Sequence, residues 1–176
     1  IQEFLSSSKD QILGILAQNN HFELTQEQRN AWLIEISLLQ RWVVGLSGFI
    51  FLEYAIPRMG KRVDAILLIK NGIFVIEFKV GSTSFDQYAI DQVVDYALDL
   101  KNFHEGSDSH AIFPILCATQ AKSIHVNLAT KEDNVFHPML VSSLSFRPTL
   151  DLCLGTCSSS DSSWQHSWAT SGYHPT

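Results

Sequence analysis

Two acidic residues and a lysine, Asp64, Glu77 and Lys79, stand in otherwise apolar stretches of the sequence. Two carboxylates suit a hard divalent cation such as Mg²⁺ or Mn²⁺, which prefers oxygen ligands and retains several waters. One of those waters can become the attacking hydroxide while the cation offsets charge on a phosphate oxygen. The lysine ammonium would orient that water and stabilise the developing negative charge. The three residues therefore predict metal-dependent hydrolysis of a phosphodiester.

A tight hairpin is expected to bring these three residues to one face of a sheet. Asn71-Gly72 is a strong hairpin signal, because a type I′ turn needs positive φ at both central residues. With these two residues as the loop, Asp64 is expected opposite Lys79, and Ile66 opposite Glu77. The alternative is an Asp64–Lys79 ion pair with Glu77 on a solvated edge. It is disfavoured because the strands are apolar at both parities, as buried strands are.

A third carboxylate is expected near this pair of acids. Glu53 interrupts the apolar run from Phe49 to Ile56, a predicted strand, and would complete or tune the coordination shell. Glu35, in the middle of a helix predicted over 25–46, competes for that role, although a lone Glu on a helix is more often solvated. The choice between Glu53 and Glu35 stays open at this point.

Other polar residues are expected to contact the substrate. Gln92 and Tyr96 are four residues apart, on one face of a helix predicted over 85–104. There the glutamine would orient a water or phosphate, and the tyrosine would contact nucleic acid or brace the lysine. Phosphate contacts are expected from Arg58, Lys61 and Arg62, since guanidinium and ammonium groups suit phosphates. The alternatives are an ordinary amphipathic helix and basic residues that serve only solubility.

Composition places the chain among ordinary globular proteins. Its 176 residues, 45% of them hydrophobic and 17% charged, fit one domain plus a tail. A net charge of −6 is not typical of a free-standing nucleic-acid-binding protein, although a local basic patch can still bind. No apolar run is long enough to span a bilayer, and an odd number of cysteines indicates a reducing compartment. A cytoplasmic protein without membrane contact is expected.

The predicted elements follow the order helix, three strands, helix, strand. After a short helix over 9–18 they are the helix over 25–46, strands at 49–56, 65–69 and 73–78, the helix over 85–104 with Ser84 as its cap, and a strand at 111–119. This order predicts an α/β fold with the αβββαβ core of restriction-endonuclease-like proteins, a mixed central sheet flanked by helices. The nuclease-like domain is expected over 1–152, with its core at 25–142.

The segment 153–176 differs in composition. Its run of serines predicts a flexible linker, while Trp164 and Trp168 indicate a docking segment. Cys153 and Cys157, followed by His166 and other histidines, resemble a zinc site only superficially, because the spacings fit no common zinc motif.

Taken together, these motifs resemble a known family. An acid followed by acid-x-lysine on the next strand is the signature of the PD-(D/E)xK nucleases, and Gln92-x-x-x-Tyr96 matches the QxxxY motif of their RecB-like branch. The chain resembles the N-terminal nuclease-like domain of bacterial proteins that continue into a Schlafen-type superfamily 1 helicase domain. The segments that carry this resemblance are 51–58, 62–65, 75–81 and 92–101. The resemblance covers about 32–119, and 168–176 resembles the lead-in to the helicase.

The resemblance implies a nuclease module fused to an ATP-driven motor. We expect a Mg²⁺- or Mn²⁺-dependent nuclease acting on nucleic acid, with DNA favoured over RNA. Asp64, Glu77 and Glu53 would bind the metal, and Lys79 and Gln92 would assist the reaction. The resemblance also implies a covalently linked helicase domain that this chain lacks, and a role in DNA repair or phage defence. The alternative is a catalytically inactive module that binds nucleic acid or docks onto the helicase.

Overall fold

The structure, a computed structural model, describes residues 1–20, 23–129, 132–159 and 161–174. Its internal contacts separate a first unit, Ile1–Ser47, from a second, Gly48–Thr176. The first unit contains α1 (Gln2–Ser6), α2 (Lys9–Gln18) and α3 (Gln26–Trp42). The second contains β1 (Phe49–Ile56), β2 (Lys61–Ile69), β3 (Gly72–Lys79), α4 (Gln87–Phe103), β4 (Ala111–Ala118), β5 (Met139–Val141) and α5 (Phe146–Leu154), with short 3₁₀ segments η1 (Glu105–Ser107), η2 (Glu132–Asn134) and η3 (Ser163–Thr170).

Side-chain caps fix the starts of the two longer helices in the first unit. The Ser8 hydroxyl accepts a bond from the Gln11 amide, and the Gln11 side chain accepts one from the Ser8 amide, which forms a complete capping box before α2. The Thr25 hydroxyl accepts a bond from the Gln28 amide at 3.1 Å, so α3 begins at Gln26. Helix α2 has the predicted bounds, whereas α3 ends at Trp42, four residues before the predicted end. No described helix combines the length and hydrophobicity that crossing a bilayer needs.

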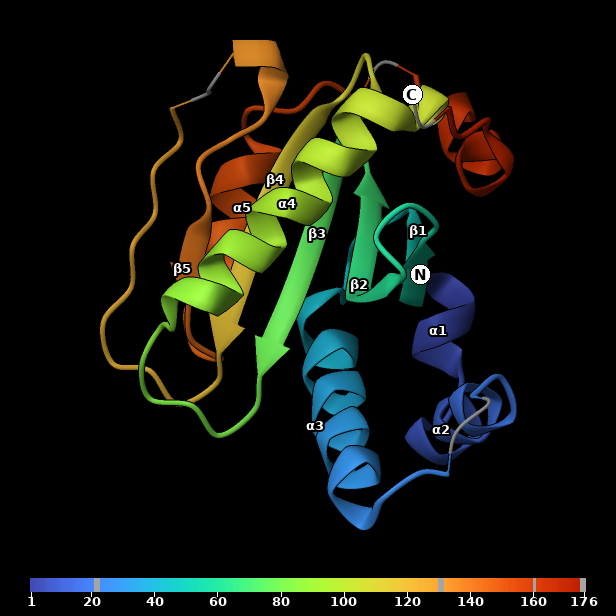
Figure 1. Ribbon diagram of the computed structural model, residues 1–176, viewed down its shortest axis with the longest axis vertical. Helices are drawn as coiled ribbons and strands as arrows, with labels where there is room; N and C mark the ends of the chain where they lie inside the picture. Colours follow the sequence, from blue (N-terminus) through green and yellow to red (C-terminus); the bar gives the residue numbers. More distant parts are fainter. Residues whose placement is uncertain (21–22, 130–131, 160, 175–176) are drawn as a thin grey trace. The chain divides into compact units, whose positions relative to one another are not determined.

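The second unit is built on a five-stranded mixed sheet with the strand order β1-β2-β3-β4-β5. The pairs β1–β2 and β2–β3 are antiparallel, whereas β3–β4 and β4–β5 are parallel. Helix α4 connects the parallel strands β3 and β4, as such crossovers require. The predicted α/β class with a mixed sheet flanked by helices is confirmed (Figure 1).

Successive side chains of each strand pack on opposite faces of the sheet. Val75 and Leu116 belong to the apolar cluster under α4, while Phe74 and Phe113 stack on the opposite face with their ring centroids 4.7 Å apart. Helix α5 packs on that opposite face, where the Cys153 sulfur lies 3.3 Å from the Met139 sulfur. The sheet therefore lies between α4 and α5.

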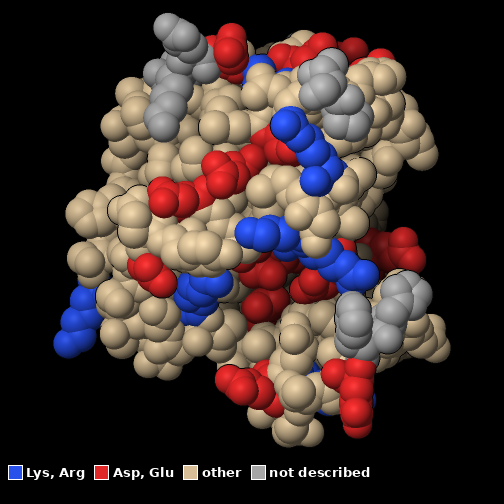
Figure 2. Space-filling model, in the orientation of Figure 1, with Lys and Arg blue, Asp and Glu red and all other residues tan. Residues whose placement is uncertain are grey.

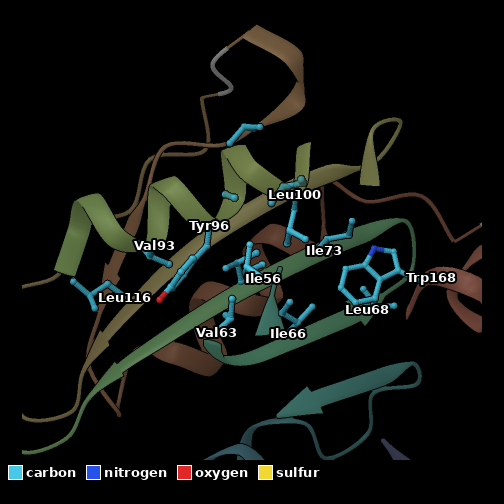
Figure 3. Close-up of a cluster of buried hydrophobic side chains, with 14 of the residues drawn as sticks. Ile56, Val63, Ile66, Leu68, Ile73, Val93, Tyr96, Leu100, Leu116 and Trp168 are labelled. Atoms are coloured by element: carbon cyan, nitrogen blue, oxygen red, sulfur yellow. The ribbon is translucent and has the colours of Figure 1, made fainter. Parts of the chain in front are cut away.

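An apolar core cluster fills the space between α4 and the sheet (Figure 3). The Tyr96 ring extends from the helix toward the strands in that view. The buried members of this cluster include Ile56, Val63, Ile66, Leu68, Ile73, Val75, Val93, Tyr96, Leu100, Ile112, Leu116 and Trp168.

The β2–β3 hairpin turns at Lys70 and Asn71, one residue earlier than predicted. Ile69 pairs with Gly72 and Ala65 with Ile76, and Lys70 has a φ of 55°. The predicted register, with Asp64 opposite Lys79, is therefore wrong. Extending the observed register places Asp64 opposite Glu77.

Contacts with the C-terminal segment explain this turn. The Asn71 amide donates to the Ser158 carbonyl at 3.1 Å, and the Ser158 amide donates to the Asn71 side chain at 2.8 Å. The Gln165 side chain donates to the Lys70 carbonyl at 2.7 Å. A Cβ on Gly72 would lie 2.9 Å from the Cys157 sulfur and 3.2 Å from a Phe113 ring carbon. Glycine is needed at 72 because other groups approach closely, and not because the turn needs positive φ.

Gly72→Ala is therefore expected to lower the free energy of unfolding by about 1–3 kcal/mol, the usual cost of overpacking a filled site. Urea unfolding measures the change. Gly14→Ala is the matched control, because Gly14 has open space in the middle of α2 and alanine should stabilise that helix by about 1 kcal/mol. Cys157→Ala should restore part of the loss at 72. Equal stability of Gly72→Ala and the parent chain would contradict the packing argument.

Helix α4 starts two residues later than predicted. Its N-cap is Asp86, whose carboxylate accepts a bond from the Tyr88 amide at 3.2 Å. Ser84 is therefore not the cap, and the acid two residues later takes this role because its oxygen reaches the first free amides of the helix.

The segment after 152 packs into the second unit. Helix α5 crosses the predicted domain boundary, and the compact units divide at 47/48 instead. Trp168 is 0% exposed, and its indole N–H donates to the Ser107 hydroxyl at 2.9 Å. The flexible linker predicted for 153–176 therefore does not describe η3, whose tryptophan is part of the core.

Candidate metal centre

Glu53 interrupts strand β1 in a strained backbone conformation. The pairing of β1 with β2 passes from Leu52 with Ala65 to Tyr54 with Val63, so Glu53 and Asp64 form no regular bridge. Glu53 has a φ of 52°, a conformation that costs a non-glycine residue about 1–3 kcal/mol. Strain of this kind is concentrated at functional positions. The acid predicted as a third ligand is thus also the irregular point of its strand.

Both strands change face at this irregularity. On β1, both Phe51 and Tyr54 pack on the cluster under α4. One is at an odd and the other at an even position, so in a regular strand they would lie on opposite faces. On β2, Ile66 and Val63 belong to that cluster, again with a change of parity. Glu53 and Asp64 lie at the point of change and are both half-buried.

The acids also end the pairing of β2 with β3. The last regular pair is Ala65 with Ile76. Beyond it, the Phe78 amide donates to Asp64 Oδ2 at 2.8 Å, and the Asp64 amide donates to Glu77 Oε1 at 3.2 Å. The two carboxylates therefore replace backbone carbonyls as acceptors, which keeps the buried amides satisfied where the strands separate.

The arrangement of oxygens fits a divalent cation. Carboxylate oxygens of Glu53 and Asp64 lie within 4.8 Å of each other. Two ligands on opposite sides of one Mg²⁺ lie about 4.2 Å apart, so a small adjustment would let both bind one ion. Glu77 is 4% exposed and interacts directly with the Asp64 carboxyl. Glu35 is half-buried in the middle of α3, in the first unit.

Burial and mutual repulsion control the charge of the acids. Desolvation raises the pKa of Asp64, and the negative charge of Glu53 raises it further. Desolvation also raises the pKa of Glu77, followed by the charge of Asp64. The positive charge of Lys79 lowers the pKa of both acids but does not reverse the shift. Such a cluster binds protons tightly, and the binding of a cation to the carboxylates would release these protons into the solvent.

A pH dependence of stability follows for the metal-free protein. The folded chain retains protons on Asp64 and Glu77 that the unfolded chain releases above about pH 4. Stability should therefore fall by on the order of 2 kcal/mol as pH rises from about 5 to about 8, the range between the unfolded and the raised folded pKa values. Thermal or urea unfolding in EDTA measures this slope.

The matched control is the double variant Asp64→Asn with Glu77→Gln, which keeps the shapes and removes both titrations. Its stability should depend much less on pH in this range. Parallel curves for the parent and the double variant would show that these two acids are not responsible for the slope.

Lys79 lies on the same face of β3 as Glu77, two residues further along, and is half-buried. The alternative of an Asp64–Lys79 ion pair does not hold, because no salt bridge joins these two among the described residues. The Asp64 carboxylate contacts the Phe78 amide and Glu77 instead. The ammonium is thus close enough to influence both acids electrostatically.

Gln92 and Tyr96 connect α4 to the site. The Gln92 side-chain N–H donates to the Tyr96 hydroxyl at 2.8 Å, and this hydroxyl donates to the Arg62 carbonyl on β2. The Gln92 Oε1 atom is buried and has no hydrogen-bond partner in the described part of the chain. Tyr96 is 1% exposed, and its burial, followed by the Glu77 charge, raises its pKa to about 12. The Tyr96 ring lies in the core, so its contact with nucleic acid and its bracing of Lys79 both stay predictions.

The predicted basic patch is dispersed in the structure. The Arg58 guanidinium lies 4.0 Å above the Phe103 ring, near the end of α4. Lys61 lies against Tyr88 at the beginning of the same helix, and its neighbour Arg62 points to the other side of β2. Figure 2 shows acidic and basic side chains interspersed on the face it presents.

The two cysteines of the superficial zinc motif serve the core instead. Cys153 is buried against Met139, and the Cys157 thiol donates to the Cys153 carbonyl. Within the described residues, neither belongs to a group spaced to hold a metal ion. The sequence does not single out Tyr88 or the backbone conformation of Glu53, and neither has a motif that would have found it. Trp168, predicted as part of a docking segment, is buried in the core.

Comparison of the chain with protein-family models, with curated proteins and with solved structures gives no significant match.

Proposed function

We propose that this chain is a metal-dependent nuclease domain of the PD-(D/E)xK type with a restriction-endonuclease-like core. The observation that carries the proposal is the strained Glu53 beside Asp64, with carboxylate oxygens within 4.8 Å, where the regular pairing of β2 with β1 is interrupted and its pairing with β3 ends. Backbone strain and buried like charges both cost stability. A bound cation would neutralise the buried like charges, and the strained backbone would hold the Glu53 carboxylate in position to bind that cation.

Each residue has a chemical role in this proposal. Asp64 and Glu53 would hold Mg²⁺ or Mn²⁺, with Glu77 completing the acidic set. When bound, the cation would polarise a phosphate oxygen and lower the pKa of a water. The Lys79 ammonium would stabilise negative charge that develops on the phosphate. The unpartnered Gln92 oxygen would accept a hydrogen bond from the attacking water and so orient it, while Tyr96 holds the Gln92 amide in place.

The wider setting is proposed from the resemblance of the motifs. DNA is favoured over RNA as the substrate, and the domain would act as one module of a helicase–nuclease protein in DNA repair or phage defence. Three free cysteines are compatible with a cytoplasmic location. With a net charge of −6, the helicase part would supply much of the affinity for nucleic acid.

Calorimetry with Mn²⁺ tests the metal site, and cleavage of plasmid, single-stranded DNA and RNA tests the reaction. The parent chain should bind Mn²⁺ and cleave, and Asp64→Asn should lose both. Glu53→Gly should weaken binding while its backbone accepts the positive φ without strain. Mn²⁺ binding is also compared between Glu35→Gln and Glu53→Gln. The variant that binds Mn²⁺ more weakly identifies the third acid. Asp151→Asn, on the surface of α5, is the control.

Three results would reject the proposal. They are the absence of Mn²⁺ binding by the parent chain, binding that survives in Asp64→Asn, and the absence of cleavage of any nucleic acid. Nucleic-acid binding without metal, unaffected by Asp64→Asn, would support the inactive binding module instead.

A further inference from the structure

An aromatic ring is exposed one turn before Gln92 on α4. Tyr88 lies in the first turn of α4 and is 64% exposed. It is the only aromatic residue among the exposed large apolar side chains in the described part of the chain. A ring in water leaves apolar area unburied that a ligand could cover.

Lys61 is held next to this ring. Its ammonium lies 3.4 Å from the Tyr88 hydroxyl and 5.7 Å from the ring centroid. The ammonium is therefore at the hydroxyl end of the ring and not over its centre, which leaves the ring available for stacking. The pair presents one flat apolar surface and one positive charge side by side.

Short connections link the pair to the site. Tyr88, Gln92 and Tyr96 follow one another at intervals of four along the same side of α4. Tyr88 is about 12 Å along the helix axis from Tyr96, at 1.5 Å per residue. On β2, Lys61 comes three residues before Asp64 and next to Arg62, whose carbonyl accepts the Tyr96 bond. Lys61 thus shares β2 with Asp64, and Tyr88 shares α4 with Gln92 and Tyr96.

We infer that Tyr88 and Lys61 form a platform for an unpaired nucleotide of a single-stranded substrate, a base on the ring and its phosphate on the ammonium. This inference rests on the proposed nuclease function and specifies its substrate. An aromatic ring can stack on a base only when that base is free of its neighbours in a duplex. Stacking of this kind tolerates any base, because every base has a π-face. The platform therefore selects strand form and not sequence.

Fluorescence anisotropy with a labelled oligothymidine tests the platform, on the full 176-residue chain in EDTA. Tyr88→Ala should weaken binding about tenfold, the usual effect of removing one stacking ring, and Tyr88→Phe should retain affinity. Lys61→Gln should lower the salt slope of log K by about 0.7, the contribution of one phosphate contact on a single strand. Leu98→Ala, at a 40% exposed position of the same helix, is the control and should bind like the parent chain.

The outcomes separate this inference from the nuclease proposal, because no divalent cation is present in the binding assay. Failure of the parent chain to bind the oligonucleotide would overturn the inference, as would equal affinity of Tyr88→Ala and the parent chain. Equal sensitivity of duplex and single-strand binding to Tyr88→Ala would overturn it as well. Loss of Mn²⁺-dependent cleavage in Asp64→Asn is a separate result, and circular dichroism verifies that each variant is folded.

Discussion

Lys79→Gln is expected to lower the rate of Mn²⁺-dependent cleavage about 100- to 1000-fold, the usual effect of removing one group that stabilises charge in the transition state. Mn²⁺ binding should survive, because an ammonium has no lone pair for a metal. The separation of binding from chemistry distinguishes Lys79 from the acids, whose replacement should remove both. Single-turnover cleavage and calorimetry on the same samples measure the two effects.

Lys122→Gln is the matched control, since it removes the same charge from an exposed position. Its cleavage rate should equal that of the parent chain. Undiminished cleavage by Lys79→Gln would show that the lysine has no part in the reaction. Loss of Mn²⁺ binding would show that its charge supports the fold of the site.

Trp168→Ala is expected to lower the free energy of unfolding by about 3–5 kcal/mol, the cost of removing a large buried aromatic side chain. The indole packs against Phe51 and Tyr54, with ring centroids 5.2 and 5.0 Å away, and these two residues stand on either side of Glu53. The variant should therefore also bind Mn²⁺ more weakly. Urea unfolding and calorimetry measure the two losses.

Trp164→Phe provides a contrasting variant in the same segment. The Trp164 indole N–H is buried without a hydrogen-bond partner in the described residues, so its removal should be neutral or stabilising. The Trp168→Ala expectation fails if that chain is as stable as Trp164→Phe. It also fails if stability drops while Mn²⁺ affinity stays at the parent value, because the link to Glu53 would then be absent.

The sequence predicts elements well where the signal is local. Apolar spacing places α2, β1, α4 and β4 within a few residues of their observed ends, because a helix or strand with one buried face must repeat its apolar residues at the matching period. The register of β2 and β3 depends instead on Asn71 and Ser158, which bond to each other across 87 residues of sequence. No local pattern contains such a contact. An Asn-Gly pair therefore indicates a turn without fixing which two residues form its loop.

The candidate site divides in the same way. Acids and a lysine at chosen positions of adjacent strands can be predicted to converge, and Asp64 and Glu77 do contact each other even though the predicted register is wrong. The positive φ of Glu53 could not be predicted, because its neighbours Phe51 and Tyr54 pack on Trp168, which is more than 100 residues away in the sequence. The burial of Tyr96 likewise depends on the whole fold. The catalytic roles of these residues stay predictions.

The hydrogen bonds from the Asp64 and Phe78 amides have a practical consequence for spectroscopy. Both amides donate to carboxylates that a cation would also use, so a bound ion would draw electron density from the acceptors of these two bonds. The nitrogen-bound protons of two residues in a buried strand pair thus become probes of the charge on the acids. In a proton–nitrogen correlation spectrum of nitrogen-15-labelled protein, these two signals would follow proton release at high pH and metal loading separately, without a substrate.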